Sequence, residues 1–261
     1  VKAGSAVLYN KENDKMLFTS PVSGEVTEIN RGEKRRILEV KIKADGANQF
    51  ETFKQADPNS LSREEVIDNM LKSGVWPFVR QRPFDVIANP EDMPKAIHVT
   101  AFDTAPLAPD YGFVAHGQGD LLQIGLDALS KLTEGKVHLN ITGNANADEA
   151  FTGAKNVQIN RVSGPHPAGN VGIQIHHIKP IKPGDVIWTV DAQNVITLGK
   201  LFIEGKFIPD RLIGIGGSGM SSIAKYLFQK GLEVSGYDQR SSYITNLLNN
   251  DGIKVDFDIS N

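Results

Sequence analysis

Glycines near the end of the chain have the spacing of a loop that binds a diphosphate. Gly214, Gly216 and Gly219 form a G-x-G-x-x-G pattern within the stretch LIGIGGSGM. In such a loop the glycines let the backbone approach the phosphates, and the amides that open the next helix favour the anion. Asp238 follows Gly219 by 19 residues and ends the next predicted strand, where a ribose or sugar hydroxyl would be bound. The order strand, turn, helix, strand and acid predicts a βαβ nucleotide-binding unit, with a purely structural βαβ unit as the alternative.

The predicted residues of this nucleotide-binding site lie on the loop, on the first turn of its helix and at one strand end. They are Gly214, Gly216, Gly217, Ser218, Gly219, Met220 and Asp238.

A second group of candidate residues lies in VSGPHPAGNVGIQIHHIKPI, residues 162–181. Prolines fix this loop and glycines allow close backbone approach, so it is typical of a structural or interface loop or of contact with a small ligand. The adjacent His176 and His177 are expected in a strand, where they would point to opposite faces, and no nearby carboxylate completes a ligand set. We therefore expect no metal site.

The segment VWPFVRQRPF interleaves arginines with aromatic residues, which can stack on a ring or bind an anion. The alternative is a loop that packs its aromatic side chains on the next domain. Together with the previous segment it gives the candidate residues of a ligand or interface loop, and no catalytic residue is predicted. These candidates are Gly164, Pro165, His166, Pro167, Gly169, Arg80 and Arg82.

The composition excludes several classes of site. The 261 residues include no cysteine, which rules out disulfides, thiolate catalysis, iron–sulfur ligation and cysteine-type zinc sites. The net charge of −3 does not indicate broad binding to nucleic acid or to an anionic membrane. No apolar run approaches the ~20 residues that span a bilayer. The first residues, VKAGSAVLYN, have no Met and resemble the middle of a domain, so we expect a fragment at this end.

The elements that position these residues fall into three parts. Residues 1–58 are β-rich, with a hairpin around NRGE. The phrase SPVSGEV resembles lipoyl/biotinyl-type barrels, which present a modifiable lysine at a hairpin tip in a DKA or MKM sequence. Here the tip reads NRGEKRR, so a carrier function is not expected. Residues 59–205 alternate helix and strand, which predicts a Rossmann-like parallel α/β domain without a dinucleotide loop after its first strand. Residues 206–261 form the partial Rossmann-type βαβ unit. The fold class is therefore α/β, with a small β-barrel module at its start.

The elements expected in the second part are a helix over 59–73, begun by a capping box of Ser62 and Glu65 and ended by Gly74, and alternating strands and helices after it. The strands are 96–102, 136–142, 156–162 and 186–190, and the helices are 119–133, 147–154 and 192–205.

Six stretches, in this order, resemble the A subunit of the bacterial sodium-translocating NADH:quinone reductases. They are PVSGEVTEINRGEKRRILEV, SGVWPFVRQRPF, KAIHVTAFDTAPLAPD, GLDALSKLTEGKVHL, GPHPAGNVGIQIHHIKP and VIWTVDAQNVITLGKLFIEGKFIPDR. The resemblance runs to about Arg211, roughly four-fifths of the chain. It implies a peripheral subunit on the cytoplasmic side of a bacterial inner-membrane complex that oxidises NADH, reduces ubiquinone or menaquinone and pumps Na⁺. The implied partners are the other subunits and the quinone, with no nucleic acid and no direct membrane span.

The same resemblance implies that the NADH site, flavins and iron–sulfur centres belong to other subunits, so no complete active site is expected here. Related flavin-carrying subunits have a loop of the type GGAGFPT, and the comparable place in this chain reads GVWPFVR. Without those glycines the backbone cannot approach a flavin phosphate as closely, and we expect no tightly bound cofactor.

After GKFIPDR the chain resembles the start of the Mur ligases, of the UDP-N-acetylmuramate–L-alanine ligase type. The chain thus looks composite, and the alternative function is a UDP-N-acetylmuramate-binding module of peptidoglycan biosynthesis. No G-x-x-x-x-G-K-[ST] loop occurs, so ligase activity is not expected. Because a two-stranded sheet is marginal alone, we expect this unit to lean on residues 95–205 or on a partner.

Overall fold

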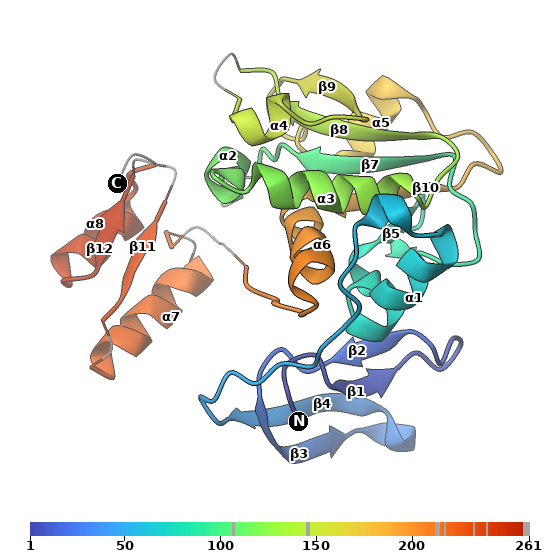
Figure 1. The fold of residues 1–261 in the computed structure, drawn as a ribbon. Helices are drawn as coiled ribbons and strands as arrows, with labels where there is room; N and C mark the ends of the chain where they lie inside the picture. The colour runs from blue at the N-terminus through green and yellow to red at the C-terminus, as the bar shows by residue number, and fades with distance from the viewer. Residues whose placement is uncertain are drawn as a thin grey trace.

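The chain forms a β-rich N-terminal part, a central sheet with helices, and a small C-terminal part (Figure 1). The structure is a computed structural model. It describes residues 1–105, 108–144, 147–211, 215–216, 218–231, 233–238 and 240–257.

The N-terminal part contains two antiparallel strand pairs. β1 (Ala6–Tyr9) pairs with β2 (Leu17–Thr19), and β3 (Gly24–Arg31) pairs with β4 (Ile37–Ala44). The turn between β3 and β4 contains a short 3₁₀ helix, η1 (Glu33–Arg35). The predicted hairpin is confirmed, with its turn slightly later in the sequence than NRGE.

Helix α1 (Arg63–Ser73) connects this part to the central sheet and begins at the predicted capping box. The Ser62 hydroxyl accepts from the Glu65 amide at 3.2 Å, and the Glu65 carboxylate accepts from the Ser62 amide at 3.0 Å. Gly74 ends the helix with a left-handed φ of 81°. Two 3₁₀ turns flank the helix, η2 (Pro58–Ser60) and η3 (Trp76–Phe78).

The central sheet has six strands in the order β6-β5-β10-β7-β8-β9. Its parallel strands are β7 (Ala96–Ala101), β8 (Lys136–Thr142), β9 (Gln158–Val162) and β10 (Ile187–Asp191). The short strands β5 (Arg80–Arg82) and β6 (Val86–Ile87) form a hairpin that adds antiparallel to β10. The sheet is therefore mixed rather than wholly parallel. A hairpin with a short turn adds antiparallel strands to the edge of a sheet, whereas βαβ connections add parallel strands.

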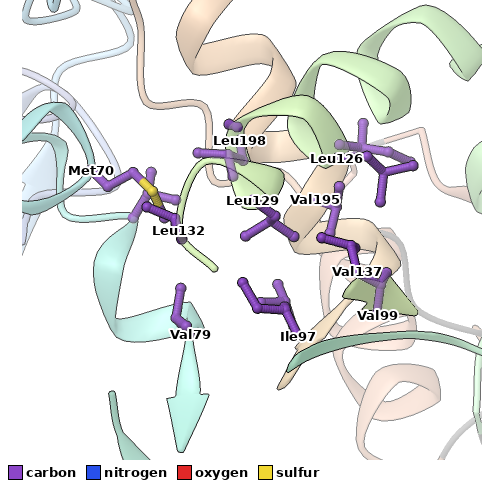
Figure 2. Packing of buried hydrophobic residues seen from close by; sticks show 14 of the residues in the cluster. Met70, Val79, Ile97, Val99, Leu126, Leu129, Leu132, Val137, Val195 and Leu198 are labelled. Carbon is purple, nitrogen blue, oxygen red and sulfur yellow. The ribbon is translucent and has the colours of Figure 1, made fainter. Parts of the chain in front are cut away.

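One face of this sheet packs on helices α3 (Gly119–Ser130) and α6 (Ala192–Glu204). A Cβ on Gly125 would lie 2.1 Å from the Val195 carbonyl oxygen, and one on Gly199 would lie 1.9 Å from that of Leu121. Glycine at these two positions is what lets the helices approach so closely. Figure 2 shows the apolar side chains of this core, among them Ile97, Val99, Leu126, Leu129, Val137, Val195 and Leu198.

The opposite face is covered by α5 (Val171–Ile178), through a small apolar cluster that includes Ala96, Ile175 and Ile187. Two short helices, α2 (Tyr111–Ala115) and α4 (Glu149–Thr152), follow β7 and β8. Helices were predicted near α3, α4 and α6, and these predictions are confirmed. The helix α5 was not predicted.

The C-terminal part contains α7 (Ser218–Gln229), β11 (Ser235–Tyr237), α8 (Tyr243–Asn250) and β12 (Lys254–Asp256). β11 and β12 pair in parallel. The Tyr237 ring stacks on that of Phe113 from α2, with centroids 3.9 Å apart, and Arg211 forms an ion pair with Asp191 at 2.9 Å. The expected contact with residues 95–205 is confirmed. Across the described stretches of chain, no helix is long and apolar enough to cross a membrane.

Candidate functional site

The loop between β9 and α5 lies against the segment that follows β7, at the carboxyl edge of the parallel strands. The amide of Gly169 donates to the Thr104 hydroxyl at 2.9 Å, and the same hydroxyl lies 3.2 Å from Nδ1 of His166. A Cβ on Gly169 would lie 2.1 Å from the backbone nitrogen of Thr104. The loop thus needs glycine at 169, and it presents the exposed His166 and Pro167 at this edge.

Gln174, fully buried on α5, fixes the same loop from below. Its amide nitrogen donates to the carbonyl oxygens of Phe102 at 3.1 Å and Gly169 at 3.0 Å. Its amide oxygen accepts from Asn140 of β8 at 3.0 Å. Asn140 in turn accepts from Asn160 of β9 at 2.9 Å. This chain of amides ties the loop rigidly to the two strands beneath it.

A stacked pair of histidines belongs to the same network. His98 of β7 and His138 of β8 are directly paired in register, and their rings lie 4.4 Å apart and nearly parallel. Nδ1 of His98 lies 3.4 Å from the Asn140 amide nitrogen, and Nδ1 of His138 lies 3.2 Å from that of Asn160. Since an amide NH₂ only donates, these contacts favour the tautomer of each neutral ring that carries its proton on Nε2. Nε2 of His98 is buried and has no hydrogen-bond partner among the described residues.

The environment of this pair strongly favours neutral rings. Burial lowers the pKa of His98 to about 3, and His138 and Lys179 add to the effect. Burial also lowers the pKa of His138, reinforced by Lys179 and Lys136 and opposed by the hydrogen bond from Asn160. Burial thus favours the neutral form of both rings, and His98 in particular resists protonation at neutral pH.

Our sequence predictions missed this network, which consists of His98, His138, Asn140, Asn160 and Gln174. The signal was present in the alternation of AIHVTA and KVHLNIT, where every second residue is polar or small. This alternation indicates one apolar and one polar face on each strand.

The two candidate arginines lie on β5 and only one of them approaches the loop. The Arg82 guanidinium would lie 3.2 Å from a Cβ on Gly172, in the first turn of α5. Arg80 bonds to the Asp85 carbonyl oxygen, and both arginines lie 3.5 Å from the Asp85 carboxylate. Of the candidate loop residues, the structure thus brings Arg82 close to the start of α5 and leaves Arg80 with its own hairpin.

The aromatic residues beside these arginines are mostly structural. Trp76 is buried, donates from Nε1 to the Ala88 carbonyl at 2.8 Å, and packs edge-on against Trp188. Phe78 contacts Phe207 with ring centroids 6.1 Å apart. Phe84 stays exposed. Trp76 thus packs within the part 59–205, and Phe78 alone of the two packs on a residue beyond it.

The expectation that His176 and His177 lie in a strand is wrong. Both are exposed residues in the last turn of α5. The helix begins at Asn170, whose side chain accepts from the Gly172 amide at 2.8 Å. In the part of the chain that the structure covers, no three His, Cys, Asp or Glu side chains are grouped so that they could hold a metal ion.

A second polar centre lies where β10 and β7 end side by side. In the sheet, β7 lies between β8 and β10. The chain passes from β7 to β8 in one direction and returns across the sheet to β10, so the strand order reverses between β7 and β10. Ligands of open α/β sheets usually bind at such a reversal. Here Asp191 accepts from the Asn194 amide at 2.9 Å and from Arg211 at 2.9 Å. Burial, with Asp191 and Asp103 nearby, raises the pKa of Tyr111, which therefore stays protonated.

The candidate glycine loop is only partly described. Gly214 and Gly217 lie outside the described residues, and Ser218, Gly219 and Met220 form the first turn of α7. Gly216 is buried, and its amide donates to the Asp238 carboxylate at 2.7 Å. A Cβ at Gly216 would lie 2.5 Å from that carboxylate. The loop and Asp238 are thus adjacent, as the pattern predicted, but the carboxylate also binds the loop itself.

An open hollow of about 1090 Å³ lies elsewhere, between the β1–β2 turn, α1 and the residues after β6. It is lined by charged side chains such as Lys11, Asp14, Arg63 and Glu91 and includes none of the candidate residues. Arg63 donates to the carbonyl oxygens of Pro90 and Asp92, which ties α1 to this segment.

Comparison with known families divides the chain in the same order as its three parts. Residues 1–45 match the model of the NqrA N-terminal barrel-sandwich hybrid domain, and residues 61–207 match that of the NqrA second alpha/beta domain. Residues 211–257 match the Mur ligase family, catalytic domain.

Curated relatives agree with the first two matches. The chain is 38% identical over 240 residues to the A subunit of a Na(+)-translocating NADH-quinone reductase from Yersinia pseudotuberculosis serotype O:1b, covering 90% of this chain and 53% of the relative. The same subunit from Yersinia pestis biovar Antiqua is 40% identical over 221 residues, with 83% and 48% covered. That of Neisseria meningitidis serogroup B is 39% identical over 221 residues, with 84% and 49% covered. The chain therefore spans about half the length of these relatives.

Proposed function

The chain belongs to the NqrA family, since the model of the second NqrA domain alone matches more than half of it. From this premise we propose that the chain works as part of the A subunit of a Na(+)-translocating NADH-quinone reductase. The observation that carries the proposal is the succession of both NqrA domain matches in one chain. In this role the chain is a peripheral subunit on the cytoplasmic side. It supports electron transfer from NADH to quinone, coupled to sodium transport, and has no complete active site of its own.

The carboxyl-edge loop is the proposed place of contact with another subunit of the complex, or with ubiquinone or menaquinone. A quinone offers two carbonyl oxygens, which accept hydrogen bonds from N–H and O–H groups. Thr104 and His166 meet at this loop within 3.2 Å, and His166 is exposed. The proposal is supported by the exposed His166 with its partner Thr104, on a loop edge that Gln174 holds in place.

The proposal assigns no tightly bound flavin to the segment 74–80. A flavin phosphate would need free backbone amides that it can approach closely. Val75, Trp76 and Val79 are buried in the core, and the Val79 amide already donates to the Trp76 carbonyl at 2.9 Å. These contacts support the expectation that this segment has no room for the group.

The finer division of the fold is also part of the proposal. We assign a barrel-sandwich module to residues 1–58, a Rossmann-like domain to 59–205 and a partial βαβ unit to 206–261. The four parallel strands with α3 and α6 on one face and α5 on the other support the second assignment. The parallel pairing of β11 and β12 supports the third.

Association with the other reductase subunits tests the proposal. The tagged chain is mixed with membranes from a strain whose reductase lacks its NqrA polypeptide, and the captured proteins are identified by mass spectrometry. We expect the remaining reductase subunits to be captured in defined proportion. Capture of none of them by a chain that is folded by circular dichroism would overturn the proposal.

A UDP-sugar-binding role for the C-terminal part is the second candidate function, and the Mur ligase match over residues 211–257 favours it. The adjacency of Gly216 and Asp238 adds support, since such an acid can bind a sugar hydroxyl beside a glycine turn. Calorimetry with UDP-N-acetylmuramate tests it, with Asp238→Asn as the variant that should weaken binding. If the folded wild-type chain gives no binding heat, this role is excluded and the first proposal is untouched.

A further inference from the structure

The turn of the β3–β4 hairpin concentrates positive charge. Residues 31–36 contain four cations, Arg31, Lys34, Arg35 and Arg36, and one acid, Glu33, so their net charge is +3. The whole chain has a net charge of −3, and the remainder therefore carries −6. All five side chains are exposed, and in the described part of the chain no ion pair joins these cations to a carboxylate. The hairpin's own ion pairs lie farther from the turn, at Lys41.

Aliphatic side chains lie directly beside these cations. Leu38 is 64% exposed, Ile29 is 49% exposed and Ile37 is 36% exposed. We call residues 29–38 the hairpin tip. It combines uncompensated positive charge with exposed aliphatic surface, and Figure 1 shows its hairpin at the end of the molecule away from β9 and α4.

The shape of the hairpin tip is held by its backbone. The Gly32 amide donates to the Arg36 carbonyl at 2.8 Å, and the Arg36 amide donates to the Glu33 carbonyl at 3.1 Å. Lys34 and Arg35 between them have φ of 54° and 62°. Residues other than glycine or asparagine rarely adopt this left-handed conformation, and such positions often serve a function. The tip therefore has cations at two positions where glycine would be less strained.

We propose that the hairpin tip docks directly onto the surface of an anionic lipid bilayer. Anionic headgroups complement the +3 charge, and Leu38 and Ile29 can enter the boundary between headgroups and acyl chains. The stems of Lys and Arg can lie along the same apolar layer. An acidic protein would offer the same charge, but the exposed aliphatic side chains beside the cations favour a bilayer, whose boundary between headgroups and acyl chains they can enter. The inference does not depend on the proposed function, because the lipid contact needs no other subunit.

Vesicle sedimentation tests the inference with the full chain. The vesicles are phosphatidylcholine alone or mixed with phosphatidylglycerol, each at low and high salt. We expect binding to the mixed vesicles only, weakened by salt. The variant Lys34→Gln with Arg35→Gln should bind them about tenfold more weakly or worse, as expected for two cations lost near such a surface. The matched control, Lys11→Gln with Lys15→Gln, removes the same charge from the exposed β1–β2 turn and should bind as the wild type does.

The aliphatic contribution has its own control. Leu38→Ala should weaken binding, whereas Tyr9→Ala, at a site that is 67% exposed on β1, should not. Equal losses in both charge variants would mean that only the overall charge matters, and would overturn the inference. So would equal binding to neutral vesicles. Tip-dependent binding to immobilised polyglutamate, without binding to vesicles, would assign the tip to an acidic protein instead.

Discussion

Removal of the buried imidazole of His98 should make the folded protein less sensitive to acid. The ring is fully buried, and its pKa is lowered to about 3 from an ordinary value of 6.5. Because the folded state resists protonation, the unfolded state binds more protons at every pH between these values. The stability that the neutral ring contributes is thus fully present above pH 6.5 and is lost progressively as the pH falls toward 3.

The size of the effect follows from the linkage relation. One proton taken up on unfolding lowers the free energy of unfolding by about 1.4 kcal/mol for each pH unit below 6.5, which gives about 2 kcal/mol at pH 5. That is a large share of the roughly 5–15 kcal/mol that stabilise a typical domain. Opening of α5, which Gln174 and Ile175 hold in place, would hydrate the ring without global unfolding. The free energy of that opening therefore sets an upper limit on the stability that protonation of His98 can remove.

Urea denaturation at pH 7.5 and pH 5, compared between wild type and His98→Phe, measures this contribution. Phenylalanine keeps a ring against His138 but cannot take up a proton. We expect the loss of stability between the two pH values to be about 2 kcal/mol smaller in the variant. As a matched control, His177→Phe removes an exposed histidine of α5 and keeps His98. If His98→Phe keeps the full wild-type pH dependence, the argument from burial is refuted.

Three further substitutions test the contacts that position the candidate loop and the C-terminal part. Gly169→Ala places a Cβ 2.1 Å from the Thr104 nitrogen and should cost about 1–3 kcal/mol in thermal or urea unfolding, whereas Gly119→Ala, with no contact under 3.5 Å, should cost little. Gln174→Leu leaves the Phe102 and Gly169 carbonyls without their donor and should lower stability by about 1–3 kcal/mol, with faster hydrogen exchange in residues 163–170; unchanged exchange there would contradict the bracing role. Arg211→Met removes the ion pair to Asp191 and should speed proteolytic cleavage between residues 205 and 218. Lys206→Met removes the same charge without breaking that ion pair, and it should not speed the cleavage.

Elements with a strong local signal could be predicted from the sequence. The capping box of Ser62 and Glu65 and the αL glycine at 74 define α1 by local chemistry, and both are present. The strand KVHLNIT was predicted with its observed bounds, since its alternating apolar residues lie between Gly135 and Gly143. The predicted proximity of the glycine turn to Asp238 also holds at Gly216.

The features that the sequence did not reveal depend on tertiary contacts. The helix α5 contains Gly172 and four isoleucine or valine residues, which favour a strand locally, and burial of Gln174 and Ile175 against the sheet overrides that preference. The polar network under α5 unites residues from four elements that are far apart in the chain. The positive charge of the hairpin tip was missed for another reason. The net charge of the whole chain, −3, sums the +3 of residues 31–36 with the acidic remainder and does not show where the cations lie.

Competition for the reductase complex tests the central claim most directly. Reductase complex lacking its NqrA polypeptide is immobilised, the chain is bound to it, and full-length NqrA from a relative is then added at increasing concentration. If the chain occupies the place of NqrA, we expect it to bind and to be displaced completely by the full-length polypeptide. A folded chain that does not bind, or that stays bound beside full-length NqrA, would contradict the assignment.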